Sequence, residues 1–488
     1  MLSSSPGIIL SFDRHVSVDS GKEQSIVASP QHQLIFQAIE PGLKRALFAL
    51  ARNGATVENM SEWIQEDRGG FGVLKFYQYL QKFTSFGWLC HTVVTKGCRI
   101  ATASPMTIDA RFLPIVAVID SPRETLRERH YILSKFAYIH QVKGQMMLES
   151  PLSKMTVHLS NWQAIAIVGL LANPCMASTI ATQIKDIHLD TIEQLIGLLL
   201  STQMLCEVAE DGTIAEQTDV VLAQWEFHDL LFHARSRSGR HANPVGGTYR
   251  FSGQIEQLPA LDSHESAQTI SLSKPDLANL VAADLPFTQV LEQRRSIREH
   301  DQIPITAQQL GEFLYRCARI KDRIHTEQGE LLTRPYPSGG AMYELELYVA
   351  VDRCQDLEPG LYYYQPQAHE LCSICDATAP VQALLKNAGM SMGADTPQLL
   401  IIITARFQRL AWKYESISYA LMLKHVGALY QTMYLVATAM NLAPCGIGSG
   451  DSDLFVQAAG GNYYAQTSVG EFALGSRPEL ASVSIDAG

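Results

Sequence analysis

Several motifs that identify large enzyme classes are missing from this chain. It has no GxGxxG after an expected strand, which is the mark of a Rossmann dinucleotide site, and no GxxxxGK[ST] phosphate loop. HExxH and GxSxG are absent too, which removes the usual zinc protease and serine hydrolase patterns. Cys372 and Cys375 form a CxxC pair within a strand-like run, but no second pair follows at zinc-finger spacing. We therefore expect no metal site.

Positive charge and long apolar runs are also scarce. Lys and Arg number 38 against 49 Asp and Glu, a net charge of -11, which argues against a general nucleic-acid binder. The apolar run 164–172 is far shorter than the ~20 residues of a membrane span, and the N-terminus lacks the basic region of a signal peptide. Nine cysteines, an odd number, are typical of reduced thiols. These observations predict a cytoplasmic protein without membrane or nucleic-acid partners.

The length of 488 residues, at roughly 150 residues per domain, suggests about three domains. A stretch rich in Pro, Ser and Asp separates a large C-terminal part from the rest, and a second break lies near 102–107. We expect a winged-helix-like domain over 1–103, a second one over 104–257, a linker over 258–285 and a mixed α+β domain over 286–488.

The two N-terminal domains look related to each other. Each indicates a helix, a turn, a short helix, a longer helix and then a strand, which is the winged-helix order. Apolar residues recur at helical spacing in the longer helices: Leu74, Phe76, Tyr77 and Leu80 in the first, and Ile192, Leu195, Ile196 and Leu199 in the second. In a winged helix this longer helix is the one that reads DNA. It carries only two Lys in the first domain and no Lys or Arg in the second, which disfavours DNA binding. Capture of an extended peptide and a scaffold or dimerisation role both remain open.

The C-terminal part alternates strands and helices. Thr306 and Gln309 form a capping box before a helix with Leu310, Phe313, Leu314 and Cys317 on one side. Strand-like runs follow at 345–351, 361–364, 370–375, 398–405 and 470–475. A long helix is expected over about 416–440.

Three short segments of this part carry candidate chemistry. Arg294-Arg-Ser-Ile-Arg298 offers guanidinium groups suited to a phosphate, although a solvated helix end would look the same. Pro337-Ser-Gly-Gly340 allows the backbone to approach a flat ligand, or is an ordinary turn. In Trp412-Lys-Tyr-Glu415 the Lys ammonium favours the tyrosinate form of the adjacent Tyr, which suits a general base, or the segment is an exposed helix start.

Taken together, RRSxR, PSGGAMYELELYV, GLYYYQP, the Lys-Tyr pair and the terminal ALGSRP resemble the FMN-binding nitroreductase-like fold. Within that fold they are similar to the azoline oxidases, which oxidise thiazolines and oxazolines in ribosomally made peptides. The winged N-terminal domains resemble the peptide-clamp domains of cyanobactin oxidases. The resemblance is good over about 285–480 and only in outline over 1–250.

The resemblance implies a set of site residues, a cofactor and partners. FMN is implied as the cofactor, a heterocyclised precursor peptide as the substrate, dioxygen as the electron acceptor and a homodimer as the assembly. The residues implied to bind FMN are Arg294, Ser296, Arg298, Ser338, Gly339, Gly340, Pro444, Cys445, Gly446, Ile447 and Arg477. Lys413 and Tyr414 are implied as the catalytic pair, with Tyr414 as the base and Lys413 supporting it or sharing the role.

Two alternatives stay open at this point. One is an NAD(P)H-dependent nitroreductase or flavin reductase, which would need neither the Lys-Tyr pair nor N-terminal peptide-binding domains. The other is a non-enzymatic winged-helix regulator that senses flavin, which would call for a basic recognition helix.

Overall fold

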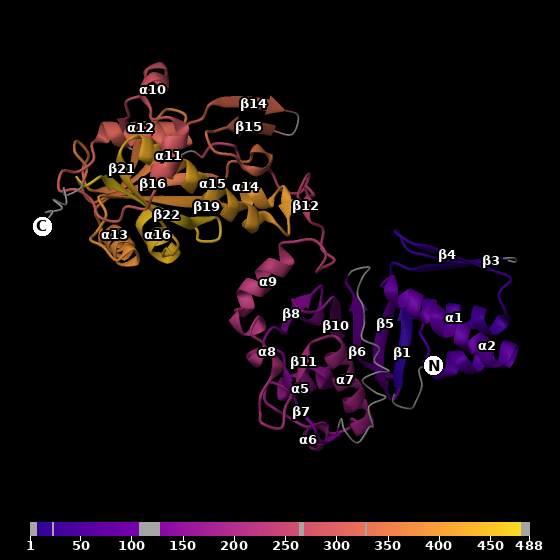
Figure 1. Cartoon of the computed structure of the whole chain (residues 1–488). Coiled ribbons are helices and arrows are strands. Elements are labelled where there is room, and N and C mark those ends of the chain that lie inside the picture. The colour runs from indigo at the N-terminus through magenta and orange to yellow at the C-terminus, as the bar shows by residue number, and fades with distance from the viewer. Residues whose placement is uncertain (1–6, 22–23, 107–126, 263–267, 327–328, 480–488) are drawn as a thin grey trace, which may run out of the picture. The chain divides into compact units, whose positions relative to one another are not determined.

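The computed structural model describes residues 7–21, 24–106, 127–262, 268–326 and 329–479. The chain separates into two compact units, Met1–Asn243 and Pro244–Gly488 (Figure 1). Both units combine antiparallel strands with helices, so the predicted α+β class is confirmed. Among the described residues, no helix is long and apolar enough to cross a membrane. The cytoplasmic location and the predicted domain boundaries stay predictions.

One six-stranded antiparallel sheet runs through the N-terminal unit. Its strands, in spatial order, are β1 (Gly7–Phe12), β5 (Leu89–Thr95), β6 (Cys98–Pro105), β10 (Met155–Leu159), β9 (Gln145–Glu149) and β8 (Tyr138–Val142). The two related pieces meet inside this sheet, because β6 of the first pairs with β10 of the second, with Thr102 opposite His158. Val93 and Ala101 of the first piece are also buried in the core of the second. Backbone hydrogen bonds and apolar packing therefore join the pieces.

The first piece adds a smaller sheet and two helices. They are β2 (Ser17–Ser20), β3 (Gln24–Ala28) and β4 (Gln33–Gln37), then α1 (Pro41–Ala51) and α2 (Val57–Ser85). The Thr56 side chain caps α2, and the helix is broken at Gly69, whose φ of 60° and ψ of -158° suit glycine. The predicted short and longer helices are the two halves of α2 on either side of this break.

The apolar face predicted for the longer helix of this piece is partly wrong. Phe76 and Leu80 are buried, but Leu74 is 60% exposed and Tyr77 is 45% exposed. The buried stripe continues to Phe83, and at about 100° per residue Leu74 and Tyr77 fall outside it.

The second piece follows the predicted order closely. Its elements are β7 (His130–Leu133), α5 (Trp162–Leu170), α6 (Ala177–Gln183), α7 (Leu189–Ser201), β11 (Leu205–Val208), α8 (Ala215–Thr218) and α9 (Phe227–Arg235), and β11 pairs with β7. The four apolar residues predicted to share a face of the longer helix, here α7, are all fully buried. This prediction is confirmed.

The C-terminal unit is built on a seven-stranded antiparallel sheet. Its spatial order is β13 (Thr269–Ser271), β18 (Glu370–Asp376), β17 (Gly360–Gln365), β16 (Leu345–Val351), β19 (Leu399–Arg406), β22 (Gln466–Ser476) and β21 (Leu442–Ile447). Helices α12 (Ala307–Ala318) and α15 (Ser418–Ala439) pack on one face, and α13 (Ala379–Met392) and α16 (Ser452–Ala459) pack on the other (Figure 1). Alternate residues of β16 enter the two cores, as a sheet covered on both faces requires.

The sequence predicted the centre of this sheet well and its edges poorly. The five predicted strands and the long helix are present, and the capping box of Thr306 and Gln309 opens α12. The predicted linker 258–285 contains β13, which pairs with β18, and the short helix α10 (Leu277–Ala283). Ala260 and Leu272 are buried, so isolated apolar residues of this stretch also enter the core.

Candidate functional site

The Ser-Gly-Gly turn lies at the start of the central strand β16 and has an unusual backbone. Gly340 has a φ of 62°, and Ala341 and Tyr343 also have positive φ values. The Ser338 Oγ accepts a hydrogen bond from the Tyr343 N–H at 3.0 Å, which closes the turn. The turn presents the small surface of Gly340 where a side chain would otherwise stand.

A buried pair that the sequence did not single out holds this turn. The Gly339 N–H donates to Nε2 of His425 at 2.7 Å, and Nδ1 of His425 lies 2.7 Å from a Glu344 carboxylate oxygen. Since Nε2 accepts, the ring proton sits on Nδ1 and is donated to Glu344. Glu344 is fully buried. It stands directly before the apolar run of β16, and an acid at the start of such a run is a sequence signal that could have found it.

Lys413 and Tyr414 follow a helix that stops just before them. Helix α14 (Phe407–Ala411) ends, Tyr414–Glu415 forms the short strand β20, and Ser416 takes a φ of 62° before α15 begins. On a regular helix neighbouring side chains point about 100° apart. The extended backbone at this position removes that restriction.

The structure brings the Lys-Tyr pair and the glycine turn together. A Cβ atom placed on Gly340 would lie 2.6 Å from the Lys413 Nζ and 2.6 Å from the Tyr414 Oη. The Lys413 Nζ lies 5.6 Å from the centre of the Tyr414 ring. Both side chains are half-buried. An amine and a phenol thus converge on one glycine, an arrangement that suits proton transfer at a flat ligand seated against this turn.

A second group of predicted residues gathers around Tyr434 on the C-terminal half of α15. The Ile297 N–H donates to the Pro444 carbonyl at 2.8 Å, so the arginine segment runs beside β21. The Tyr434 Oη lies 2.8 Å from the Ser296 Oγ and accepts the Gly446 N–H at 2.7 Å. The guanidinium of Arg294 stands 5.2 Å from the centre of the Tyr434 ring.

The other predicted cofactor residues lie at or near this second group. Cys445 is buried, and burial raises the pKa of its thiol while the charge of Arg298 lowers it. Ile447 ends β21, and its carbonyl accepts the Tyr430 hydroxyl at 3.0 Å. Arg477 donates to the Asn441 side chain at 3.0 Å. On α15 Tyr434 lies nine positions after His425, which is about 13.5 Å along the helix at 1.5 Å per residue.

A buried acid lies in the cavities next to β21. Glu471 of β22 lines two neighbouring cavities of about 250 and 320 Å3, which also share Ile447 and Gly450. Its side chain is 5% exposed, and burial raises the pKa of the carboxyl above its ordinary value of 4.5. A hydrogen bond from Ser468 opposes this shift, and Asp451 adds to it.

This shift predicts a pH-dependent stability gain for Glu471→Gln. Because the unfolded acid ionises near pH 4.5 and the folded acid only at higher pH, folding is penalised progressively as pH rises through that interval. The neutral amide avoids the penalty. We expect Tm of the variant minus Tm of the parent, measured by calorimetry, to increase from pH 4 to pH 8. Glu358→Gln, at an exposed acid, should give a flat difference, and a flat difference for Glu471→Gln would contradict the assignment.

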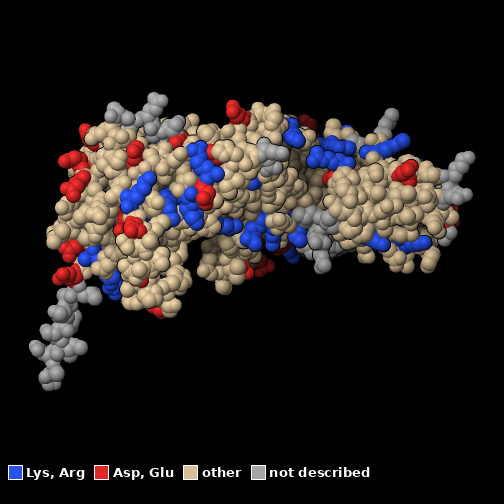
Figure 2. Space-filling model, turned by 90° about the horizontal axis from the view of Figure 1, so that it is seen from above, with Lys and Arg blue, Asp and Glu red and all other residues tan. Residues whose placement is uncertain are grey.

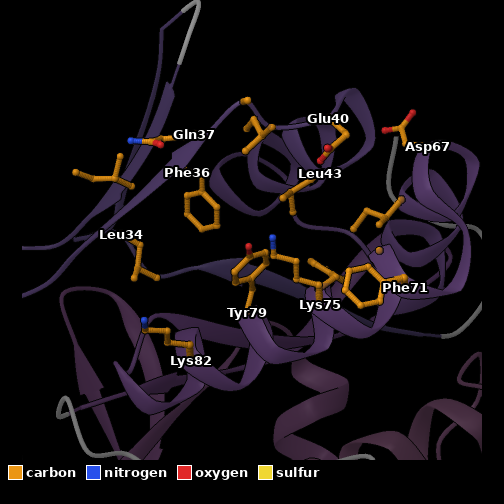
Figure 3. Close-up of a pocket in the computed structure, with 16 residues that line it drawn as sticks. Leu34, Phe36, Gln37, Glu40, Leu43, Asp67, Phe71, Lys75, Tyr79 and Lys82 are labelled. Atoms are coloured by element: carbon orange, nitrogen blue, oxygen red, sulfur yellow. The ribbon is translucent and has the colours of Figure 1, made fainter.

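The N-terminal unit has a groove between its small sheet and α2 (Figure 3). Its volume is about 430 Å3, and its walls come from β4, the start of α1 and both halves of α2. Phe36 and Phe76 are buried at its base, whereas Phe71 is 71% exposed at its mouth. Lys75 and Lys82 line the same groove. β4 is the terminal strand of its sheet among the described residues, so its outer edge is available for pairing.

Comparisons with known proteins assign the parts of the chain. Residues 4–113 match the family model for the ThcOx helix-turn-helix domain, residues 131–242 match that for the cyanobactin oxidase ThcOx, and residues 291–475 match the nitroreductase family. The C-terminal part of the chain is thus similar to the nitroreductase family, and the two preceding parts are similar to domains of the cyanobactin oxidase ThcOx. These matches support an oxidoreductase and azoline oxidation in peptide maturation.

Individual relatives each cover less than half of this chain. A putative nitroreductase of Methanocaldococcus jannaschii is 29% identical over 37% of this chain and 85% of its own length. The microcin B17-processing protein McbC of Escherichia coli is 30% identical over 22% of this chain and 42% of its own length. A solved putative nitroreductase of Ralstonia eutropha is 20% identical, covers 49% of this chain and all of its own, and has a TM-score of 0.35.

Proposed function

We propose that this oxidoreductase uses FMN to dehydrogenate thiazolines or oxazolines to thiazoles or oxazoles in a heterocyclised precursor peptide. The convergence of the Lys413 Nζ and the Tyr414 Oη on Gly340 is the observation that carries the proposal. A reductase of small molecules does not need a base at this position. The reaction does, because a carbon-bound proton must leave the ring.

The residues present fit an FMN phosphate and a flat ring. Arg294, Arg295 and Arg298 stand within five residues, and within the described parts of the chain none of them forms an ion pair. Unpaired guanidinium groups beside the Ser296 hydroxyl suit a phosphate. Gly339 and Gly340 carry no side chains, so His425 lies close to the first and Lys413 and Tyr414 lie close to the second. We assign the ring to the Ser338–Gly340 turn and the 444–447 segment, and the phosphate to Arg294, Ser296, Arg298 and Arg477.

The proposed roles of the chain's own residues follow from their positions. The ring proton at Cα is acidified by the adjacent C=N bond, and Tyr414 takes it as the tyrosinate, whose negative charge the Lys413 ammonium stabilises before the transfer. His425 and Glu344 hold the Gly339 N–H and so fix the turn that faces the pair. FMN bound by these residues would supply the acceptor for the hydride that leaves Cβ.

Peptide capture is assigned to the groove between β4 and α2. An extended peptide can add to the open edge of β4 and place its side chains against Phe36, Phe71 and Phe76. A nucleic-acid partner has less support than a peptide, because the face in Figure 2 carries several small patches of Lys and Arg together with scattered Asp and Glu. The chain's acidic balance points the same way.

Homodimerisation and dioxygen use complete the proposal. Val281 of α10 is 86% exposed, and Phe287 of α11 (Phe287–Gln293) is 67% exposed, so the C-terminal unit carries apolar surface that a second copy could cover. Light scattering of the purified chain tests the dimer, and hydrogen peroxide release tests dioxygen as the acceptor.

The function itself is tested by mass spectrometry on a thiazoline-containing peptide. We expect each ring to lose two hydrogen atoms in the presence of the FMN-loaded protein and air. Rapid NADPH turnover with no change in the peptide would instead favour a nitroreductase or flavin reductase. Salt-dependent DNA binding without turnover would favour the flavin-sensing regulator.

Peptide capture gives a separate prediction for the groove. Phe71→Asp places a charge among the apolar lining residues, and we expect it to weaken precursor-peptide binding by about tenfold, equivalent to about 1.4 kcal/mol. Leu74→Asp is the matched control, because Leu74 is 60% exposed on the same helix but does not line the groove. Isothermal titration of both variants measures the effect, and equal affinities would remove the groove from the proposal.

A further inference from the structure

A strap of residues 244–257 crosses the Lys-Tyr segment within the C-terminal unit. Its first part, β12 (Gly246–Gly247), pairs antiparallel with β20, with Gly247 opposite Tyr414. The Tyr249 N–H donates to the Lys413 carbonyl at 3.1 Å. Main-chain bonds from the strap therefore hold the backbone of both predicted catalytic residues.

Side chains fasten the strap at both ends of the same segment. The Trp412 indole N–H donates to the Ile255 carbonyl at 2.7 Å, and the Ser416 hydroxyl donates to the Pro244 carbonyl at 2.9 Å. Between them, Thr248 donates to the Glu415 carboxylate at 3.0 Å. These contacts explain why residues 412–416 can depart from helical geometry, since the strap supplies partners that a helix would otherwise provide.

One strap residue reaches the reactive group itself. The Lys413 Nζ lies 5.4 Å from the centre of the Tyr249 ring and 5.6 Å from the centre of the Tyr414 ring, so the ammonium stands beside two aromatic faces. The Tyr249 ring is in turn held edge-on to Trp412, with the centres 5.9 Å apart. Tyr249 takes a φ of 52°, an uncommon backbone conformation for a side chain of this size.

We propose that Tyr249 is a positioning residue that holds the Lys413 ammonium beside Tyr414 through the face of its ring. The inference rests on the proposed function only for its effect on turnover. An aromatic face attracts an ammonium ion but leaves its N–H groups available, so Lys413 can still act on Tyr414 or on the substrate. The proposal assigns the effect to the ring face, which phenylalanine retains.

Three variants of the full chain test this role. Tyr249→Leu removes the ring face, Tyr249→Phe keeps it, and Tyr464→Leu makes the same change at a tyrosine that is 80% exposed. For Tyr249→Leu we expect kcat on a thiazoline peptide to fall about tenfold or more with little change in KM, because the reacting geometry is loosened. Tyr249→Phe and Tyr464→Leu should match the parent. A loss in Tyr249→Phe equal to that in Tyr249→Leu, or no loss in either, overturns the proposal.

A second measurement does not depend on turnover. The rate at which acetic anhydride acylates Lys413 is compared with that of the exposed Lys424 in the same sample by peptide mass spectrometry. Removal of the Tyr249 ring should raise the Lys413 to Lys424 ratio severalfold, and Tyr249→Phe should not. If the parent fails to oxidise azolines but the ratio changes as expected, the proposed function falls and the positioning role stands. An unchanged ratio in Tyr249→Leu overturns the positioning role.

Discussion

The Lys413→Ala, Tyr414→Phe double variant is expected to keep its flavin and its fold and to lose azoline oxidation by about 100- to 10,000-fold, the range that general base catalysis contributes. The first change removes the amine and the second removes the hydroxyl group, and these are the two groups that converge on Gly340. Neither residue belongs to the arginine segment assigned to the FMN phosphate. The flavin absorbance of the purified variant tests whether the cofactor is retained. The mass-spectrometric assay on a thiazoline peptide tests whether oxidation is lost.

The matched control is Tyr419→Phe with Lys424→Ala, which makes the same chemical changes at exposed residues of the neighbouring helix α15. It should retain activity close to that of the parent. Full activity in the Lys413, Tyr414 double variant would show that the proton is taken by another group.

The second large effect is expected from a single methyl group. In Gly340→Ala the new Cβ would lie 2.6 Å from both the Lys413 Nζ and the Tyr414 Oη, so the two side chains must move apart. A displacement of about 1 Å at reacting groups can cost about 100-fold in turnover. We expect kcat to fall by that order, as measured with the thiazoline peptide, while the melting temperature changes little.

The backbone cost of this substitution can be separated from its steric cost. Gly393 at the end of α13 has a φ of 67°, close to the 62° of Gly340, but nothing lies within 4 Å of a Cβ placed there. Gly393→Ala therefore carries the same conformational strain, about 1 kcal/mol, without the collision. It should destabilise the protein slightly and leave kcat unchanged. An equal loss of activity in both variants would point to strain instead of displacement of the catalytic pair.

The sequence predicted elements whose signals are local. Apolar runs located the central strands β16 and β19, and the Thr306 to Gln309 spacing located the start of α12, because burial and capping depend on residues close together in the chain. β21 was missed, since Pro444 and Gly446 read as a loop and only pairing with β22 makes the segment a strand. Leu74 and Tyr77 were misplaced, because helical spacing alone does not say which stripe meets the core.

The candidate site shows the same division between local and long-range information. Lys413, Tyr414 and the glycine turn could be picked out as residue types, but 73 positions separate Gly340 from Lys413, and only the fold shows that they meet. Nothing in the sequence of the long helix distinguishes His425, and only the fold shows that it accepts the Gly339 N–H. The strap was missed for a related reason, since the pairing of β12 with β20 joins residues that are far apart in the chain.

The pairing of β6 with β10 has a consequence for anyone who wishes to exchange recognition modules. A chimaera that replaces residues up to about 105 would cut through a continuous hydrogen-bond ladder and strip the cover from Val157 and its neighbours. Both halves would then display open, apolar strand edges, which invite aggregation. Retargeting should therefore graft side chains of the β4 groove onto the intact unit, or transplant 7–243 as a whole.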